Sequence, residues 1–268
     1  MKINKARLLK DAVDIITPSL TALFNLSFQT RTFPSIWKTA KVIPLFKKGD
    51  KQNASNYWPI SILLTVSKIL EKAVHTQFYA YLTEHNLISP NQFGFRLKSS
   101  TVTAASQLSG KILDAMDNGC LTGATFLDLA KTLDTVNHTI LLQKLSNYGV
   151  DDTAKAWFTS FLTNRKQATS CNDVCSEVAS VSIGIAEGSI LGLLLFIIYM
   201  KDLPDVLRFC HVTLYADDII LYLASKSTAD LQSKINADLR RICKWLQANQ
   251  LTLNIKKSKY LLIGSSSH

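Results

Sequence analysis

The amino-acid sequence predicts an α+β protein in which long helices are mixed with antiparallel β-hairpins. Apolar residues recur at helical spacing over several segments, and residues 228–248 show the clearest such stripe. Runs rich in β-branched and aromatic residues flank a tight polar break at Asp217-Asp218, which is typical of a β-hairpin. A hydrophobic content of 47% over 268 residues is enough to bury a sizeable core.

The first part of the chain alternates amphipathic helices with short strands and turns. Proline has no N–H group and its ring clashes with the preceding turn, so a break or a new first turn should fall at Pro18 in the first helix. The expected elements are a helix over 6–28 interrupted at Pro18, a strand over 41–46 with a basic turn after it, a loop over 56–61, a helix over 67–82, a turn over 91–96 and a helix over 101–116.

The second part begins with an apolar strand over 124–127 that ends in Asp128. Its expected elements then follow in chain order: a helix over 139–148 closed by Gly149, a helix capped by Asp151 or Asp152 that reaches Leu162, two short strands and their turn within 167–185, a glycine-bracketed loop over 184–191, an apolar helix over 190–200, a hairpin over 212–223, a helix over 228–248 and two strands around a basic turn over 251–263.

The charge and the cysteine pattern restrict the class of protein. Thirty Lys and Arg residues against twenty Asp and Glu give a net charge of +10, which favours nucleic acid or an anionic surface as partner, with a merely basic protein as the alternative. Five scattered cysteines lack zinc-ligand spacing, so free thiols in a reducing compartment are the simplest account. No signal peptide is visible, and the apolar run 190–200 is too short to span a bilayer. We expect an intracellular protein, in the nucleus or the cytoplasm, with no membrane partner.

Two acidic sites follow strand-like segments. Asp217-Asp218 has no glycine for the positive φ that tight hairpins favour, although an isolated pair of this kind is most simply an ordinary acidic turn. Asp128 ends another strand upstream. If the two strands are neighbours, three carboxylates meet at one sheet edge, which is costly unless cations neutralise them. Mg²⁺ prefers such carboxylate oxygens, and two ions together can activate a hydroxyl and stabilise a leaving pyrophosphate.

Basic side chains gather where the predicted strand 41–46 meets its turn. Lys41, Lys47, Lys48 and Lys51 suit phosphate contacts as point charges, while a solvated basic loop is the alternative. An acidic centre with a basic rim favours nucleotidyl transfer on nucleic acid.

Several short motifs occur in a fixed order along nearly the whole chain. Tyr215-Ala-Asp-Asp218 is the tetrad typical of reverse transcriptases. With the blocks around it, the sequence closely resembles the reverse-transcriptase domain of non-LTR retrotransposons, of the LINE type and jockey-like. The matching blocks are Phe33-Pro-x-x-Trp37-Lys38, Lys41-Val-Ile-Pro-Leu-Phe-Lys-Lys-Gly-Asp50, Asn56-Tyr-x-Pro-Ile-Ser61, Leu-Glu-Lys72, Gln92-Phe-Gly-Phe-Arg96, Phe126-Leu-Asp-Leu-x-Lys131, Asp134-x-Val, Gly188-Ser-Ile-Leu191 and Lys257-Ser.

The resemblance implies a right-hand polymerase fold with fingers and palm, in which an antiparallel palm sheet is backed by helices. Residues 1–110 would form an N-terminal extension and the fingers. Residues 111–268 would form the palm, with a fingers-like return near 150–185. We expect no thumb, because the chain ends soon after the palm motifs.

The resemblance also implies roles for individual residues. Asp128 and Asp217 would be the principal metal ligands, supported by Asp218, for two Mg²⁺ ions or for Mn²⁺ as a substitute. The partners would be an RNA template, a DNA primer and a dNTP, and no specific protein partner follows. Lys257 would protonate the pyrophosphate, or be a solvated turn lysine. The expected nucleotide-binding residues are Lys41, Leu129, Leu133, Glu187, Gly188 and Lys257, and the expected nucleic-acid-binding residues are Lys47, Lys48 and Arg96.

The sequence departs from the family pattern at several substrate positions. The family's Ala-Phe-Asp is Thr132-Leu133-Asp134, so the position that would stack under the sugar lacks its ring. Its Pro-Gln-Gly is Ala186-Glu187-Gly188, which puts a carboxylate near a polyanion. Trp58 stands where an arginine is expected, and Leu193 where a proline is expected. These changes and the missing thumb predict a truncated, divergent copy with weak or absent activity.

Three functions therefore remain open at the level of the sequence. The leading one is an RNA-directed DNA polymerase domain that transfers nucleotides from dNTP to a primer 3′-hydroxyl on an RNA template. The alternative is a catalytically silent nucleic-acid-binding remnant of a retroelement. The third is a non-enzymatic interaction or structural protein that retains only the core.

Overall fold

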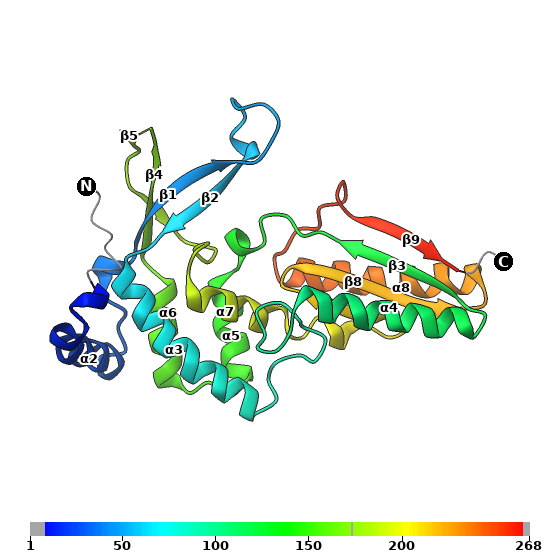
Figure 1. The fold of residues 1–268 in the computed structure, drawn as a ribbon, viewed down its shortest axis with the longest axis horizontal. Coiled ribbons are helices and arrows are strands. Elements are labelled where there is room, and N and C mark those ends of the chain that lie inside the picture. The colour runs from blue at the N-terminus through cyan, green and yellow to red at the C-terminus, as the bar shows by residue number, and fades with distance from the viewer. Residues whose placement is uncertain (1–8, 173, 265–268) are drawn as a thin grey trace. The chain divides into compact units, whose positions relative to one another are not determined.

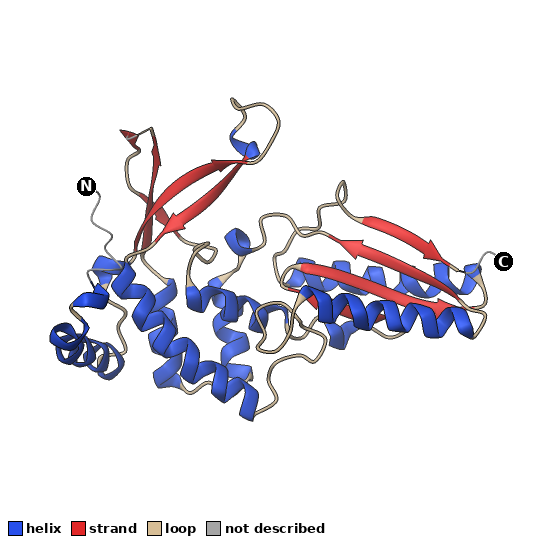
Figure 2. Ribbon diagram, in the orientation of Figure 1, coloured by secondary structure: helices blue, strands red, loops and turns tan. Residues whose placement is uncertain are grey.

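The structure is a computed structural model that describes residues 9–172 and 174–264, and these form two compact units, each built on a β-sheet (Figure 1). The first unit comprises Met1–Ala80 and His138–Gly192, and the second comprises Tyr81–Asn137 and Leu193–His268. Consecutive helices and consecutive strands are mixed along the chain, which confirms the predicted α+β class (Figure 2). Residues 6–8 of the predicted first helix lie outside the described residues.

The first unit contains a sheet with strand order β2-β1-β4-β5, in which β6 also pairs with β4. Strand β1 is antiparallel to β2 and parallel to β4. The elements that begin in this unit are α2 (Val13–Gln29), η1 (Ser35–Trp37), β1 (Thr39–Phe46), η2 (Ala54–Asn56), β2 (Tyr57–Ile62), α3 (Thr65–Glu84), α5 (His138–Asn147), α6 (Asp152–Leu162), β4 (Arg165–Cys171), β5 (Val174–Cys175), β6 (Ala179–Val181) and α7 (Ile190–Met200), and α3 and α7 continue into the second unit.

Two predictions for the first unit were wrong. Residues 56–61 were expected to be a loop, but β2 covers most of them because it pairs with β1 and places Pro59 opposite Pro44. A proline is tolerated on this outer strand, where the missing N–H costs no ladder bond. Pro18 lies inside α2, beyond its first turn, so it neither breaks the helix nor starts a new one, and the helix continues without the one hydrogen bond that proline cannot donate.

Aromatic rings fill the core of the first unit. Phe33 is fully buried and makes edge-to-face contacts with Trp37, Trp157 and Phe161. Such contacts add to the stabilisation from area burial. The guanidinium carbon of Arg165 lies 4.4 Å from the Phe161 ring centroid, so this buried cation is covered by an aromatic face.

The second unit contains a four-stranded antiparallel sheet of order β7-β8-β3-β9. Its remaining elements are α4 (Thr101–Asp117), β3 (Leu121–Leu127), η3 (Leu133–Thr135), η4 (Pro204–Val206), β7 (His211–Tyr215), β8 (Asp218–Ser225), α8 (Thr228–Ala248) and β9 (Lys259–Ile263). Helix α8 has the bounds expected from its apolar stripe, and Leu231, Ile235, Ile242 and Leu246 of that stripe are buried.

Helices α4 and α8 cover opposite faces of this sheet (Figure 1). A Cβ at Gly123 would meet Ile235 of α8 at 2.7 Å, so α8 lies on the face of Gly123. Side chains alternate between the two faces along a strand, so Phe126, three residues after Gly123, points to the other face. Phe126 lines a pocket there together with Leu108 of α4. The Asp128 carboxylate belongs to the α4 side.

Two further predictions of strands need correction. Residues 251–263 contain one strand, β9, rather than two, and Leu253 forms only an isolated bridge with Leu129. The region 167–185 holds three short strands, β4 to β6, rather than two.

Among the helices of the described residues, none combines the length and the hydrophobicity that a membrane span requires.

Candidate active site

The pairing of β3 with β8 determines where the acidic residues lie. Leu127, the last residue of β3, lies opposite Ile219, and Asp218 is the first residue of β8. Asp128 therefore leaves β3 beside the start of β8, at the end of the sheet where the hairpin turns. The condition left open by the sequence, that the two strands are neighbours, is therefore met.

The hairpin turn consists of Ala216 and Asp217, not of Asp217 and Asp218 as the sequence suggested. Tyr215 pairs with Asp218 across a two-residue loop, and Ala216 has a positive φ of 56°. A non-glycine residue in this region costs of order 1–3 kcal/mol and persists only where the surroundings hold it. The turn therefore needs support from outside the hairpin.

Gln92 supplies that support. Its side-chain oxygen accepts hydrogen bonds from the backbone N–H groups of Ala216 at 2.9 Å and Gly94 at 2.8 Å. Its amide nitrogen donates to the Ala216 carbonyl at 3.3 Å. A Cβ at Gly94 would lie 2.2 Å from the Ala216 nitrogen, so only glycine permits this approach. Sequence reasoning matched Gln92 to a motif but assigned it no role.

The three carboxylates interact electrostatically. Partial desolvation raises the pKa of Asp218 above its usual range, and the charges of Asp217 and Asp128 raise it further. Asp217 Oδ2 accepts a hydrogen bond of 3.1 Å from the hydroxyl of buried Thr132. Lys257 Nζ lies 3.9 Å from Asp128 Oδ2, an exposed ion pair that contributes little to stability.

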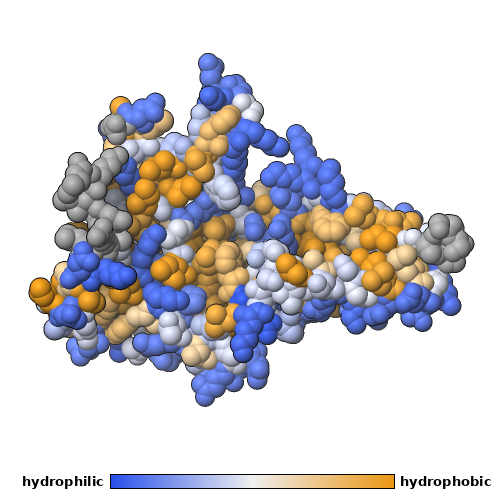
Figure 3. Space-filling model, viewed as in Figure 1, coloured by the Kyte–Doolittle hydropathy of each residue, from blue (hydrophilic) through white to orange (hydrophobic). Residues whose placement is uncertain are grey.

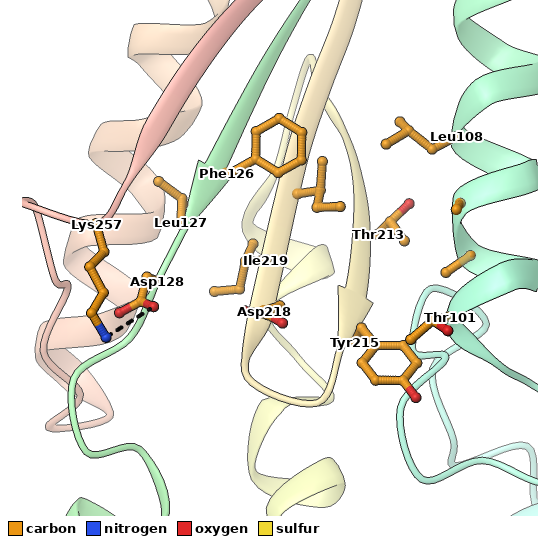
Figure 4. A pocket seen from close by; sticks show the side chains of 13 residues that line it. Thr101, Leu108, Phe126, Leu127, Asp128, Thr213, Tyr215, Asp218, Ile219 and Lys257 are labelled. Carbon is orange, nitrogen blue, oxygen red and sulfur yellow. Dashed lines mark ion pairs between the residues drawn. The ribbon is translucent and has the colours of Figure 1, made fainter. Parts of the chain in front are cut away.

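Asp128, Asp218 and Lys257 line a pocket of about 480 Å³ between α4 and the sheet (Figure 4). Figure 4 shows the Lys257 ammonium directed at Asp128, with Asp218 at the start of the neighbouring strand. The remaining wall is mostly apolar and includes Leu108 and Phe126. This open, polar-ended pocket is large enough for a small ligand.

The donor chemistry suits a hard divalent cation. Three carboxylates close enough to perturb one pKa present the oxygen ligands that Mg²⁺ prefers, and a cation would relieve their repulsion. Among the described residues, no three His, Cys, Asp or Glu side chains are gathered around one point as a complete metal site. Asp217 and Asp128 instead contact Thr132 and Lys257.

Other predicted site residues of the second unit have structural contacts. Leu129 is buried and forms a bridge with Leu253, next to a hydrogen bond of 2.8 Å from the Asn254 N–H to the Asp128 carbonyl. Leu133 is half-buried in η3. Arg96 Nη1 donates a hydrogen bond to the Ser89 carbonyl at 3.4 Å, so the guanidinium contacts the backbone of the loop that carries it.

The remaining predicted residues belong to the first unit. Lys41 lies on β1, and Lys47 and Lys48 follow it. Glu187 and Gly188 lie in the loop before α7, and the Glu187 carbonyl accepts a hydrogen bond of 3.0 Å from the Ser61 N–H. Gly188 has a φ of 115°, and a Cβ there would lie 2.5 Å from the Ser61 carbonyl oxygen.

Glu71, on α3, anchors the other end of that loop. Its Oε2 accepts from the Ser189 hydroxyl at 2.6 Å and from the backbone N–H groups of Ile190 and Leu191 at 2.9 and 3.4 Å. The carboxylate is fully buried. Burial lowers the pKa of Arg165, and the negative charge of Glu71 opposes that lowering. Glu71 stood in a matched motif without a role, and the available signal was an acidic residue beside the apolar stripe of its helix.

Acidic residues therefore lie at the ends of neighbouring strands, beside a pocket that a lysine also lines. Comparison with known proteins identifies the class. The chain belongs to the reverse transcriptase (RNA-dependent DNA polymerase) family, whose model matches residues 46–267. The resemblance inferred from the motifs is therefore confirmed.

Its relatives include proteins of non-LTR retrotransposons from Drosophila melanogaster. The chain is 28% identical over 254 residues to the probable RNA-directed DNA polymerase from transposon BS. It is 28% identical over 258 residues to the RNA-directed DNA polymerase from mobile element jockey, and 28% identical over 244 residues to the probable RNA-directed DNA polymerase from transposon X-element. Each alignment covers 89% of this chain, which spans 27% of the length of each relative.

Proposed function

We propose that this chain is the polymerase domain of a non-LTR retrotransposon and catalyses RNA-directed DNA synthesis. The observation that carries the proposal is the pairing of β3 with β8, which places Asp128 beside Asp218 and Asp217 at one end of a sheet. Family membership and relatives named as RNA-directed DNA polymerases support it. The substrates would be an RNA template, a DNA primer and a dNTP.

In this proposal Asp128, Asp217 and Asp218 hold two Mg²⁺ ions, with Mn²⁺ as a substitute. When bound, the ions would activate the primer 3′-hydroxyl and stabilise the leaving pyrophosphate. Lys257 would serve as the nearby proton donor to the pyrophosphate, and its 3.9 Å ion pair with Asp128 supports a place at the acidic site. The backbone at Leu129 would help to position the triphosphate.

The two units suggest a division into fingers and palm. The antiparallel sheet β7-β8-β3-β9 carries the carboxylates and would be the palm. The first unit, with Lys41, Lys47 and Lys48 on and after β1, would be the fingers. Chain segment 138–192 returns to the first unit, which supports the expected fingers-like return.

We expect the activity of this chain to be weak. Leu133 offers no aromatic ring to the sugar, and Glu187 brings a negative charge toward the nucleic acid. Thr132, which replaces the alanine of the family pattern, ties Asp217 by a hydrogen bond that an alanine cannot make. In this proposal each change affects a contact with substrate or metal.

The test is extension of a DNA primer on poly(rA) by the purified chain, with Asp217→Asn as the site variant. Asp152→Asn is the matched control, because its side chain is 93% exposed and lies on α6, outside the proposed site. We expect slow extension that Asp217→Asn abolishes and Asp152→Asn leaves unchanged. Fast, Asp217-dependent extension would refute weak activity, and extension unaffected by Asp217→Asn would refute the site.

A restored variant separates a slow enzyme from a silent one. Leu133→Phe combined with Glu187→Gln and Thr132→Ala returns three positions to the family pattern. At least tenfold faster extension by this variant is the expected result. If it also fails to extend, the second candidate gains support, namely a catalytically silent protein that binds nucleic acid. Affinity for an RNA/DNA hybrid that falls steeply with salt would then identify that binding function.

A further inference from the structure

The hairpin formed by β1 and β2 carries an exposed tryptophan. Trp58 is 50% exposed, whereas the chain's other tryptophans, Trp37, Trp157 and Trp245, are all buried. Trp58 lies opposite Leu45 in the register of the two strands. Exposing half of an indole forgoes burial that would stabilise the fold, so this ring is available for a ligand.

Trp58 belongs to an apolar row on one face of the hairpin. Cross-strand partners point to the same face, so Trp58 and Leu45 share it with the next pair, Ile60 and Ile43, and with Ile62. All five side chains are exposed. Figure 3 shows apolar side chains gathered over these strands. The opposite face carries Val42 and Ser61, which are buried.

Lysines border this row at both ends. Lys47 Nζ lies 5.2 Å from the centroid of the Trp58 ring, within the range of a cation–π interaction. Lys41 lies opposite Ile62 at the other end of the row. Residues 41–58 contain four lysines, at positions 41, 47, 48 and 51, and a single acidic residue, Asp50. The edge of the apolar face is therefore strongly cationic.

We propose that Trp58 and Lys47 form a binding site for an unpaired nucleotide of single-stranded nucleic acid. The base stacks on the indole, and the Lys47 ammonium contacts the adjoining phosphate. Single-strand binding proteins combine these elements, an aromatic platform with cations along the backbone. This proposal depends on the proposed function for one premise only, namely that the protein encounters single-stranded nucleic acid.

The chemistry of the row favours this ligand over two others. Trp58 carries no charge, so it lacks the ionic contact that an arginine at this position would make with a triphosphate. A protein partner that covered the row would also have to desolvate Lys41 and Lys47 at its ends, which is costly without acidic partners. A nucleotide suits both the uncharged indole and the lysines at the ends of the row, because its base is apolar on its faces and its phosphate is anionic.

The test measures binding of the full chain to a fluorescein-labelled rU20 oligonucleotide and to an abasic oligomer of equal length. We expect Trp58→Ala to weaken rU20 binding on the order of tenfold, and Trp58→Phe to weaken it less. The abasic oligomer should bind weakly to the unmodified chain, to Trp58→Ala and to Trp58→Phe. Ile183→Ala is the control, because it removes an exposed apolar side chain outside the hairpin, and it should leave the affinity unchanged.

Two further readouts make the result decisive. Because Trp58 is the one exposed tryptophan of the four, rU20 should reduce acrylamide quenching of the unmodified chain and should not do so in Trp58→Phe. Lys47→Ala should lower the slope of log affinity against log salt by about one. Trp58→Arg should bind rU20 and the abasic oligomer almost equally, because it exchanges stacking for charge.

Several outcomes would overturn the site. These are equal affinity of Trp58→Ala and the unmodified chain, equal binding of rU20 and the abasic oligomer, or unchanged acrylamide quenching. A dimer in sedimentation that Trp58→Ala dissociates would assign the row to a second copy of the chain. If primer extension fails but rU20 binding still depends on the base, the polymerase activity is rejected and the Trp58 site is supported.

Discussion

Glu71→Ala tests whether one buried carboxylate holds the loop before α7 in place. Glu71 Oε2 accepts from the Ser189 hydroxyl at 2.6 Å and from the Ile190 N–H at 2.9 Å, and the Ser189 hydroxyl oxygen in turn accepts from the Gly192 N–H at 2.8 Å. Without Glu71 the first N–H groups of α7 lose their acceptor. A helix start that is buried without such partners is unfavourable.

The expected loss of unfolding free energy is about 3 kcal/mol. Removing a side chain that caps a helix costs about 1 kcal/mol. A hydrogen bond to a charged group contributes roughly 2 kcal/mol more. Glu71→Gln keeps a carbonyl acceptor of the same shape but removes the charge that interacts with Arg165 and the helix dipole. We therefore expect that variant to lose about 1 kcal/mol of unfolding free energy.

Urea unfolding followed by far-UV circular dichroism measures the change, and hydrogen exchange locates it. Glu84→Ala is the matched control, because Glu84 is an exposed glutamate at the end of the same helix. Faster exchange should be concentrated at residues 184–192. A loss below about 1 kcal/mol in Glu71→Ala, or exchange in 184–192 equal to that of the control, would refute the anchoring role.

Three further variants test other parts of the second unit. Burial raises the pKa of Asp238, but hydrogen bonds from the backbone of 208–210 and from a neighbouring arginine outweigh it and leave the pKa below its usual range. Its carboxylate therefore stabilises the fold above the unfolded pKa of about 3.9 and loses this effect as pH falls through the folded pKa. Asp238→Asn should be less stable at pH 7, with a gap that narrows at acid pH in urea unfolding, and a constant gap would contradict this. Gly94→Ala should lower the melting temperature, since its Cβ would lie 2.2 Å from the Ala216 nitrogen, and an unchanged melting curve would disprove the close approach. Thr132→Ala should raise Mn²⁺ affinity several-fold in electron paramagnetic resonance titrations, because it frees a carboxylate oxygen, whereas equal affinity would show that the hydroxyl does not compete.

Local patterns in the sequence predicted most of the helices and strands. The apolar spacing of 228–248 and 101–116 predicted α8 and α4 nearly to the residue. Asp151, one of the two candidate cap residues, caps α6, and its carboxylate accepts from the Thr153 N–H at 2.7 Å. These features depend on neighbours in the chain, which is why composition and spacing are sufficient to predict them.

Predictions failed where pairing with another segment decides the local structure. Residues 57–62 are mostly strand-favouring types apart from Pro59, and they form β2 because the preceding strand, β1, offers an edge to pair with. The turn at Ala216 is shifted by one residue from the predicted acidic pair, since Gln92 stabilises its positive φ from far away in the sequence. Backbone propensity is weaker than such tertiary hydrogen bonds.

The sequence alone determined the family, through motifs in a fixed order, and it named the three carboxylates as one candidate site. The tertiary structure decided what holds that site. Glu71 meets Ser189, 118 residues away, and Gln92 meets Ala216, 124 residues away. The physical reason is that a buried polar group must find hydrogen-bond partners wherever the fold brings them, and no local spacing records which residues those are.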